Sequence, residues 1–183
     1  MKKAIVTLCI LLTAVVLFSQ VALEKIAVVP VPPPAGFRVS VSINKGQGAT
    51  YHPGENIMIS FSTNKDAYVV LYDIMPSGEV RIIFPNAYDK DNFVKANRVY
   101  TVPRQGYQFL IDNVRGREYL QIIACLSQFS TYETWHRMIV TEAFPMASMN
   151  AEDYFMNYEQ KIIVVPDNPK PVWTSATTWF NVN

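Results

Sequence analysis

Apolar and polar residues alternate with a period of two along much of this chain. In residues 37–43 every second position is apolar, the pattern of a strand with one buried face. Residues 51–84 continue as three apolar runs separated by two turn signals, which predicts an antiparallel meander. The middle run, residues 68–74, is almost wholly apolar. It therefore predicts a central strand that is buried on both faces.

The turn signals are as informative as the strands. Pro53 and Gly54 suit the central positions of a type II turn, because proline presets the first φ angle and glycine accepts the positive second one.

The further predicted strands are 80–84, 98–102, 107–111, 118–126, 161–165 and 173–182. The last of these, 173–182, is expected to close a sheet edge. Short strands at such regular spacing favour an immunoglobulin-like antiparallel β-sandwich.

Between residues 130 and 160 the spacing becomes helical. Ser130 and Glu133 have the spacing of a capping box, and apolar residues follow at helical intervals. A second helix start is indicated at residues 150–153. The expected fold is therefore mainly β, with one or two short helices between residues 130 and 160.

The N-terminus has a different character from the rest of the chain. Lys2 and Lys3 precede an apolar run over residues 4–18, and small or polar residues follow. This pattern predicts a secretory signal peptide over residues 1–20. An uncleaved anchor is the alternative, although the run is shorter than the roughly 20 residues that a spanning helix needs. The protein is thus expected to be exported, to the periplasm, the cell envelope or the medium.

A spacer is expected to separate the signal peptide from the folded domain. Four prolines fall within residues 30–34, and such density keeps a chain extended. We assign residues 21–36 to this spacer and residues 37–183 to a single domain. Membrane contact is expected only through the N-terminal segment, and only if that segment stays uncleaved.

Composition narrows the possible functions. The chain has 183 residues, of which 50% are apolar and 17% charged, with a net charge of +1. These values are typical of a globular protein, and they give no basic footprint for nucleic acid. Once the signal peptide is removed, Cys125 is the single thiol, so no internal disulfide can form. Because Cys125 lies in an apolar run, we expect it to be a buried hydrophobe.

Catalytic and metal sites find little support in the residue pattern. A hydrolase would need a nucleophile and a base, and the combination the chain offers is Cys125 with His136. Two histidines and one thiol show no zinc-ligand spacing. The stretch Asp89–Asn92 lacks the later ligands of a calcium loop. We therefore expect no enzyme activity, no metal and no cofactor, with a Cys125/His136 envelope hydrolase as the alternative.

The polar loop after the fourth predicted strand is the candidate contact surface. Loops on a rigid scaffold commonly carry binding residues, and here aromatic rings flank the polar positions. Exposed rings can anchor a protein partner or stack on sugars, so a carbohydrate-binding module is a second alternative. The candidate partner-contact residues are Asn86, Tyr88, Asp89, Asp91, Asn92 and Phe93.

Several of these motifs also resemble a known family. Those that carry the resemblance are Tyr51-x-Pro-Gly-Glu55, Thr63 to Asp73, Gly78-x-Val80, Ile83-Phe-Pro-Asn86, Asp91-Asn92 and Pro103. In this order they resemble the bacterial family known as domain of unknown function 4384, over roughly residues 37–127. The resemblance implies an exported β-sandwich and brings no agreed activity or catalytic residues. The expected function is thus a non-catalytic binding or structural module of the bacterial cell envelope, whose partner is an unknown protein or envelope component.

Overall fold

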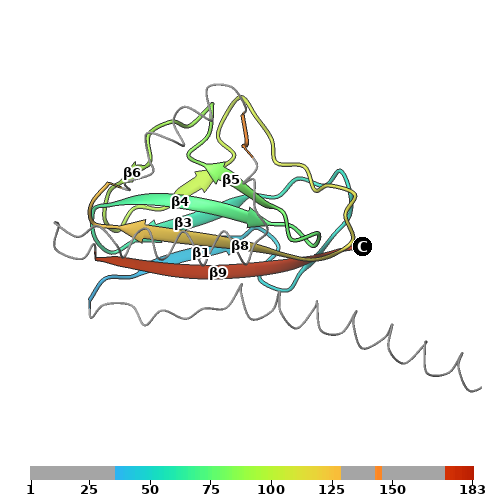
Figure 1. Cartoon of the computed structure of the whole chain (residues 1–183), viewed down its shortest axis with the longest axis horizontal. Helices are drawn as coiled ribbons and strands as arrows, with labels where there is room; N and C mark the ends of the chain where they lie inside the picture. Colours follow the sequence, from blue (N-terminus) through green and yellow to red (C-terminus); the bar gives the residue numbers. More distant parts are fainter. Residues whose placement is uncertain (1–35, 129–142, 146–171) are drawn as a thin grey trace, which may run out of the picture.

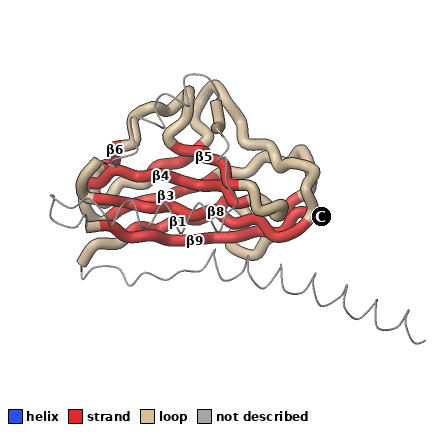
Figure 2. The backbone as a smooth tube through the Cα atoms, viewed as in Figure 1, coloured by secondary structure: helices blue, strands red, loops and turns tan. Residues whose placement is uncertain are grey.

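The computed structural model describes residues 36–128, 143–145 and 172–183, and within these ranges the chain is mainly β with no helix (Figure 1). Two sheets are present. One has the strand order β1-β3-β7, and the other has the order β2-β9-β8-β4-β5, with β6 paired to β4 (Figure 2). The strands are β1 (Val39–Ile43), β2 (Thr50–Tyr51), β3 (Ile59–Thr63), β4 (Ala67–Ile74), β5 (Val80–Phe84), β6 (Phe93–Val94), β7 (Tyr100–Val102), β8 (Gly116–Cys125) and β9 (Trp173–Val182).

Most of the predicted strands are confirmed, with shifts at their ends. The predicted strand 107–111 is wrong, because this stretch contributes only an isolated bridge between Asn56 and Leu110. The strand predicted at 161–165 lies outside the described residues. So do the signal peptide, nearly all of the spacer and most of the segment predicted to contain helices, of which residues 143–145 are described and are not helical.

The predicted meander is only half right. Strands β4 and β5 form the expected antiparallel pair, but β3 pairs with β1 and β7 in the other sheet. The burial patterns explain the separation. β3 alternates between fully and partly buried positions, whereas nearly every residue of β4 is buried. β3 has one partly exposed face and β4 has two buried faces, so the two strands pack against different neighbours. The turn at residues 64–66 carries the chain from one sheet to the other.

The last strand is not at a sheet edge. β9 lies between β8 and the two-residue strand β2, and it pairs with β2 in parallel. The prediction of a purely antiparallel arrangement is therefore wrong at this pair. The central positions predicted for β4 and β8 are confirmed, since each has a paired strand on both sides. In Figure 1 the long strands β4, β8 and β9 lie along the long axis of the molecule.

A hydrophobic core receives side chains from both sheets. Phe61 of β3 and Phe84 of β5 belong to different sheets, yet their ring centroids lie 5.3 Å apart. Leu71 of β4 and Ile122 of β8 are fully buried in the same core. Because every second residue of a strand faces the same side, the odd-numbered residues of β4 and the even-numbered residues of β8 share this inner face.

Two glycines fix the backbone near the ends of the sheets. Gly54 has a φ angle of 83°, and the Glu55 amide donates a 3.0 Å hydrogen bond to the His52 carbonyl. The predicted type II turn is thereby confirmed. Gly116, at the start of β8, has a φ angle of 136°, and a Cβ atom added there would lie 2.8 Å from Cβ of Pro76. The β4–β5 turn can approach β8 this closely because residue 116 has no side chain.

Candidate functional site

The structure divides the predicted contact loop into a buried and an exposed half. Asn86, Asp89 and Asn92 are buried, whereas Tyr88 and Asp91 are exposed and Phe93 is half-buried. Among the side chains predicted to make contacts, the three buried residues are therefore scaffold. Whether the exposed ones meet a partner stays a prediction.

Asn86 organises the loop from inside. Its Oδ1 accepts hydrogen bonds from the amides of Tyr88 and Asp89, at 2.8 and 2.9 Å. Its Nδ2 donates to the Ile83 carbonyl at 2.8 Å and to the Tyr107 hydroxyl at 3.2 Å. A buried amide with all these partners holds its neighbours in place. Asn86 thus fixes the backbone on which the exposed Tyr88 stands.

Tyr107 and Asp89 extend this network to the next loop. The Tyr107 hydroxyl donates a 2.7 Å hydrogen bond to Asp89 Oδ2, and Arg104 forms a 3.1 Å ion pair with Asp89 Oδ1. Burial, together with the hydrogen bond to Asp89, raises the pKa of Tyr107 to about 12. The phenol therefore remains a hydrogen-bond donor at every physiological pH.

Four aromatic rings cover this network. Tyr88 stacks on Tyr107 with ring centroids 4.8 Å apart and planes 10° apart. Tyr107 and Phe109 meet edge to face at 5.4 Å, and Phe144 lies 5.5 Å from Phe109. Tyr88 is 58% exposed. We call Tyr88, Tyr107, Phe109 and Phe144 the aromatic cluster. At the surface of this cluster the exposed Tyr88 ring stacks on the Tyr107 ring.

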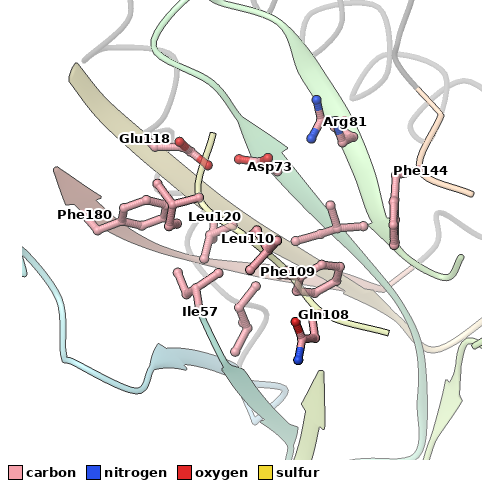
Figure 3. A pocket seen from close by; sticks show the side chains of 13 residues that line it. Ile57, Asp73, Arg81, Gln108, Phe109, Leu110, Glu118, Leu120, Phe144 and Phe180 are labelled. Atoms are coloured by element: carbon pink, nitrogen blue, oxygen red, sulfur yellow. The ribbon is translucent and has the colours of Figure 1, made fainter. Parts of the chain in front are cut away.

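A pocket of about 120 Å³ opens beside the aromatic cluster, and Phe109 and Phe144 belong to both (Figure 3). Nine of its thirteen lining residues are apolar, and Asp73 and Glu118 both line it as well. Figure 3 shows the carboxyl groups of Asp73 and Glu118 facing one another, with the Arg81 side chain on the other side of Asp73.

Strand register brings these charged residues together. Asp73 is paired with Arg81 across β4 and β5 and with Leu120 across β4 and β8. Glu118 lies two residues from Leu120 and thus on the same face, diagonal to Asp73. The side chains of Asp73, Arg81, Glu118 and Leu120 all project from the core face of the six-stranded sheet. The site therefore lies where the hydrophobic core meets one end of the sheet.

The two carboxyl groups share a proton. Asp73 and Glu118 are each only 8% exposed and are joined by a side-chain hydrogen bond. Burial raises the pKa of both, and the charge of Asp73 and the hydrogen bond to it help raise the pKa of Glu118 to about 10. Two carboxylates in contact cannot both ionise without a counter-charge. At neutral pH Glu118 therefore keeps the proton and donates it to Asp73.

One oxygen atom of the Asp73–Glu118 pair takes no part in their hydrogen bond. Asp73 Oδ1 is fully buried and has no hydrogen-bond partner among the described residues. Nearby, Arg81 lies 3.8 Å from the exposed carboxylate of Asp112 and lowers the pKa of both pocket carboxyls, without offsetting the effect of burial. The arrangement places an unpartnered acceptor beside a pocket that both apolar and charged side chains line.

Of the two residues of the alternative hydrolase site, only Cys125 lies within the described part of the chain. Cys125 lies at the end of β8, is only 2% exposed, and has its Sγ 3.5 Å from the Ser127 hydroxyl. His136 lies outside the described residues. Within the described ranges no group of three or more His, Cys, Asp or Glu residues could hold a metal ion. In the same ranges no helix has the length and apolar character needed to cross a membrane.

The sequence analysis missed Asp73 and Glu118. A usable signal was present for Asp73, because it interrupts the apolar run predicted to be buried on both faces, and a carboxyl group is rarely buried without a partner. Glu118 stands at the start of the next buried run. Their juxtaposition depends on the register of two strands that residues 75–115 separate, and the residue pattern does not specify this register.

The comparisons with known proteins agree with the resemblance seen in the motifs. A family model described as "Domain of unknown function (DUF4384)" matches residues 50–128. This range takes in β2 to β8, including the Asn86 network and the pair of pocket carboxyls, and leaves β9 outside. The comparisons with curated proteins and with solved structures found no match. Residues 50–128 are thus similar to the DUF4384 family, in agreement with the resemblance that the motifs indicate.

Proposed function

We propose that this protein is an exported, non-catalytic binding or structural module of the bacterial cell envelope, built as an immunoglobulin-like β-sandwich. The sandwich is supported by the common core of the two sheets, in which rings from both meet. Export is supported by the N-terminal sequence, with its two lysines and apolar run. A binding role rather than thiol catalysis is supported by the burial of Cys125, because a buried thiol is inert.

The observation that carries the binding role is the exposed ring of Tyr88. Its backbone amide is fixed by Asn86 and its ring stacks on Tyr107. An aromatic side chain that is already ordered loses little conformational entropy when a partner covers it. Aromatic anchors of this kind dominate the energetics of many interfaces. Tyr88 is thus the residue on which we place the partner contact, with Asp91 and Phe93 beside it.

Photo-crosslinking in the bacterium that encodes the protein tests this role. A photoreactive amino acid at position 88 should give one dominant adduct in the envelope fraction, and an excess of unlabelled wild-type protein should suppress it. The matched control places the same group at Val99, which is 70% exposed and lies outside the aromatic cluster. Identical adducts at both positions, or none at position 88, would refute the contact.

A carbohydrate ligand is the second candidate, because a sugar ring can stack on an exposed aromatic face. The same feature favours it: Tyr88 presents a supported ring at the surface. A glycan array with the wild-type protein, Tyr88→Ala and Val99→Ala separates the two candidates. Loss of signal in Tyr88→Ala alone favours a glycan, and a silent array with a positive crosslink favours a protein partner.

A further inference from the structure

The pocket beside the aromatic cluster has the dimensions of a small ligand site. Its volume is about 120 Å³, somewhat below the roughly 150 Å³ of an apolar cavity that accepts benzene. A ligand of about four to six non-hydrogen atoms would fill it. The walls that such a ligand would touch include Ile57, Phe109, Leu110, Phe144 and Phe180, which are all apolar.

At its polar end the pocket has a carboxyl oxygen that can accept a hydrogen bond from a ligand. Asp73 is more than nine-tenths buried, and its Oδ1 has no hydrogen-bond partner among the described residues. A buried acceptor left unsatisfied is unfavourable. A ligand group that donates to this atom would remove that cost. The site is therefore built for a donor and not for an anion, which would meet a carboxyl group at close range.

The charges around the pocket favour a cation. The charged groups that act on the pair are Arg81 of β5 and Asp112, while β9 faces the pocket with Phe180. When the carboxyl pair keeps one proton, these groups together carry one more negative than positive charge. A bare metal ion would leave the apolar walls unused, and no set of three ligands exists for it in the described ranges. An organic cation with N–H donors and an apolar stem satisfies both ends.

We propose that this pocket binds a short primary alkylammonium group, with its –NH₃⁺ donating to Asp73 Oδ1 beside Glu118 and its alkyl chain lying against Phe109, Leu110 and Phe180. The group is either a free small amine or the end of a lysine side chain. A primary ammonium offers three donors. A quaternary ammonium offers none, and an alcohol of the same length brings a donor without the charge.

Proton release gives this proposal a quantitative signature. The free pocket holds a proton between Asp73 and Glu118, and the bound cation takes over its role as counter-charge. Binding should therefore release about one proton, which is a rise of about tenfold in affinity for each pH unit. The ammonium itself stays charged below a pKa of about 10.4. The rise should thus extend over about pH 6 to 9, where Glu118 is protonated in the free protein.

The experiment is titration of the purified full-length protein with n-butylammonium, followed by amide NMR shifts of β4 and β8 and by calorimetry. Expected results are a dissociation constant that falls about tenfold per pH unit and a heat that changes with the ionisation enthalpy of the buffer. Butanoate, 1-butanol and tetramethylammonium are the matched ligand controls and should bind at least about tenfold more weakly. Equal binding of butanoate, or no butylammonium binding up to pH 9, would overturn the proposal.

Two variants locate the site. Asp73→Asn removes the charge at nearly constant shape and should weaken butylammonium at least about tenfold at pH 8.5, the change that 1.4 kcal/mol produces. Asp66→Asn, at the exposed opposite end of β4, should bind within about twofold of wild type, because surface charges contribute little. If Asp73→Asn fails to fold, the pH slope of the wild-type protein decides alone. Unchanged affinity in a folded Asp73→Asn protein contradicts the proposal.

A lysine derivative distinguishes the two sources of the group. Nα-acetyl-lysine methylamide carries the same butylammonium end on a blocked backbone. Binding of both probes at the β4 and β8 amides points to a lysine side chain of a partner. Binding of butylammonium alone points to a free amine, because the pocket then excludes the attached backbone. Either result supports the shared chemistry.

Discussion

The buried carboxyl pair predicts an unusual dependence of stability on pH, which Glu118→Gln should remove. Glutamine has the shape of glutamate, and its amide can donate to Asp73 in place of the shared proton. In the folded protein the pKa of Glu118 is raised to about 10 from its ordinary value of 4.5. Below pH 4.5 both states are protonated and the group contributes nothing. Above it the unfolded chain releases a proton that the folded chain retains, so wild-type stability falls as pH rises.

The size of the effect follows from the width of this window. Each pH unit between the two pKa values costs the wild type about 1.4 kcal/mol. From pH 4.5 to pH 7 the sum is about 3 kcal/mol, an upper limit because relaxation of the folded protein reduces the shift. Glu118→Gln should match the wild type near pH 4.5 and exceed it by about 1–3 kcal/mol at pH 7. Urea unfolding at pH 4.5, 5.5, 7 and 8 measures the difference.

The control variant is Glu55→Gln, for which the stability difference from wild type should change with pH in the opposite direction. Glu55 is partly exposed, and its pKa is lowered, first by the side-chain hydrogen bond with Lys45. Its contribution is present above its unfolded pKa and is lost as the pH falls, so Glu55→Gln should be the less stable protein at pH 7 and approach wild type in acid. If the free energy difference between Glu118→Gln and wild type were flat from pH 4.5 to 8, the folded protein would not hold the proton.

Three further predictions concern the scaffold. Gly116→Ala should destabilise the protein by about 2–4 kcal/mol in urea unfolding, since it adds a clash to the positive φ, whereas Gly46→Ala, with open space around it, should show only the backbone cost of about 1 kcal/mol. In a Cys9→Ser background, the Cys125 thiol should stay unreactive toward a thiol reagent until the protein unfolds, and rapid native labelling would contradict its burial. Asn86→Ala should lower the free energy of unfolding by about 2–4 kcal/mol, because it leaves buried partners unsatisfied, and an unchanged urea midpoint would show that the loop does not depend on this amide.

Much of the fold could be predicted because its strands are long and carry a clear period. The extents of β5 and β9 match their predictions, and β4 and β8 are central as their continuous apolar runs indicate. The strands that were missed, β2 and β6, have two residues each. Such strands have no period of their own and are defined by distant partners. The same dependence on distant partners placed β3 and β4 in different sheets although only a short turn separates them.

The candidate contact loop shows where residue type is ambiguous. Asn86 and Asn92 have the polarity of surface residues, but the structure uses both as internal hydrogen-bonding groups. A buried amide can satisfy several backbone groups at once, and the residue pattern does not distinguish this role from an exposed one. Tyr88 differs from them, since it is the most exposed member of the aromatic cluster and so lies at the surface, where a contact residue is expected.

The pocket was harder to foresee than the loop, for a reason that lies in the period of the strands. Alternation places Asp73 on the same face as Leu71, so the pattern that predicts a buried strand also predicts a buried carboxyl group. What alternation does not supply is the neighbour, because a shift of one residue between β4 and β8 would turn Glu118 to the opposite face. In the observed register the two carboxyls meet and share a proton, and one oxygen remains for a ligand. The chemistry of the site is therefore a property of the strand pairing, and a change that shifts this pairing should abolish amine binding and the pH dependence together.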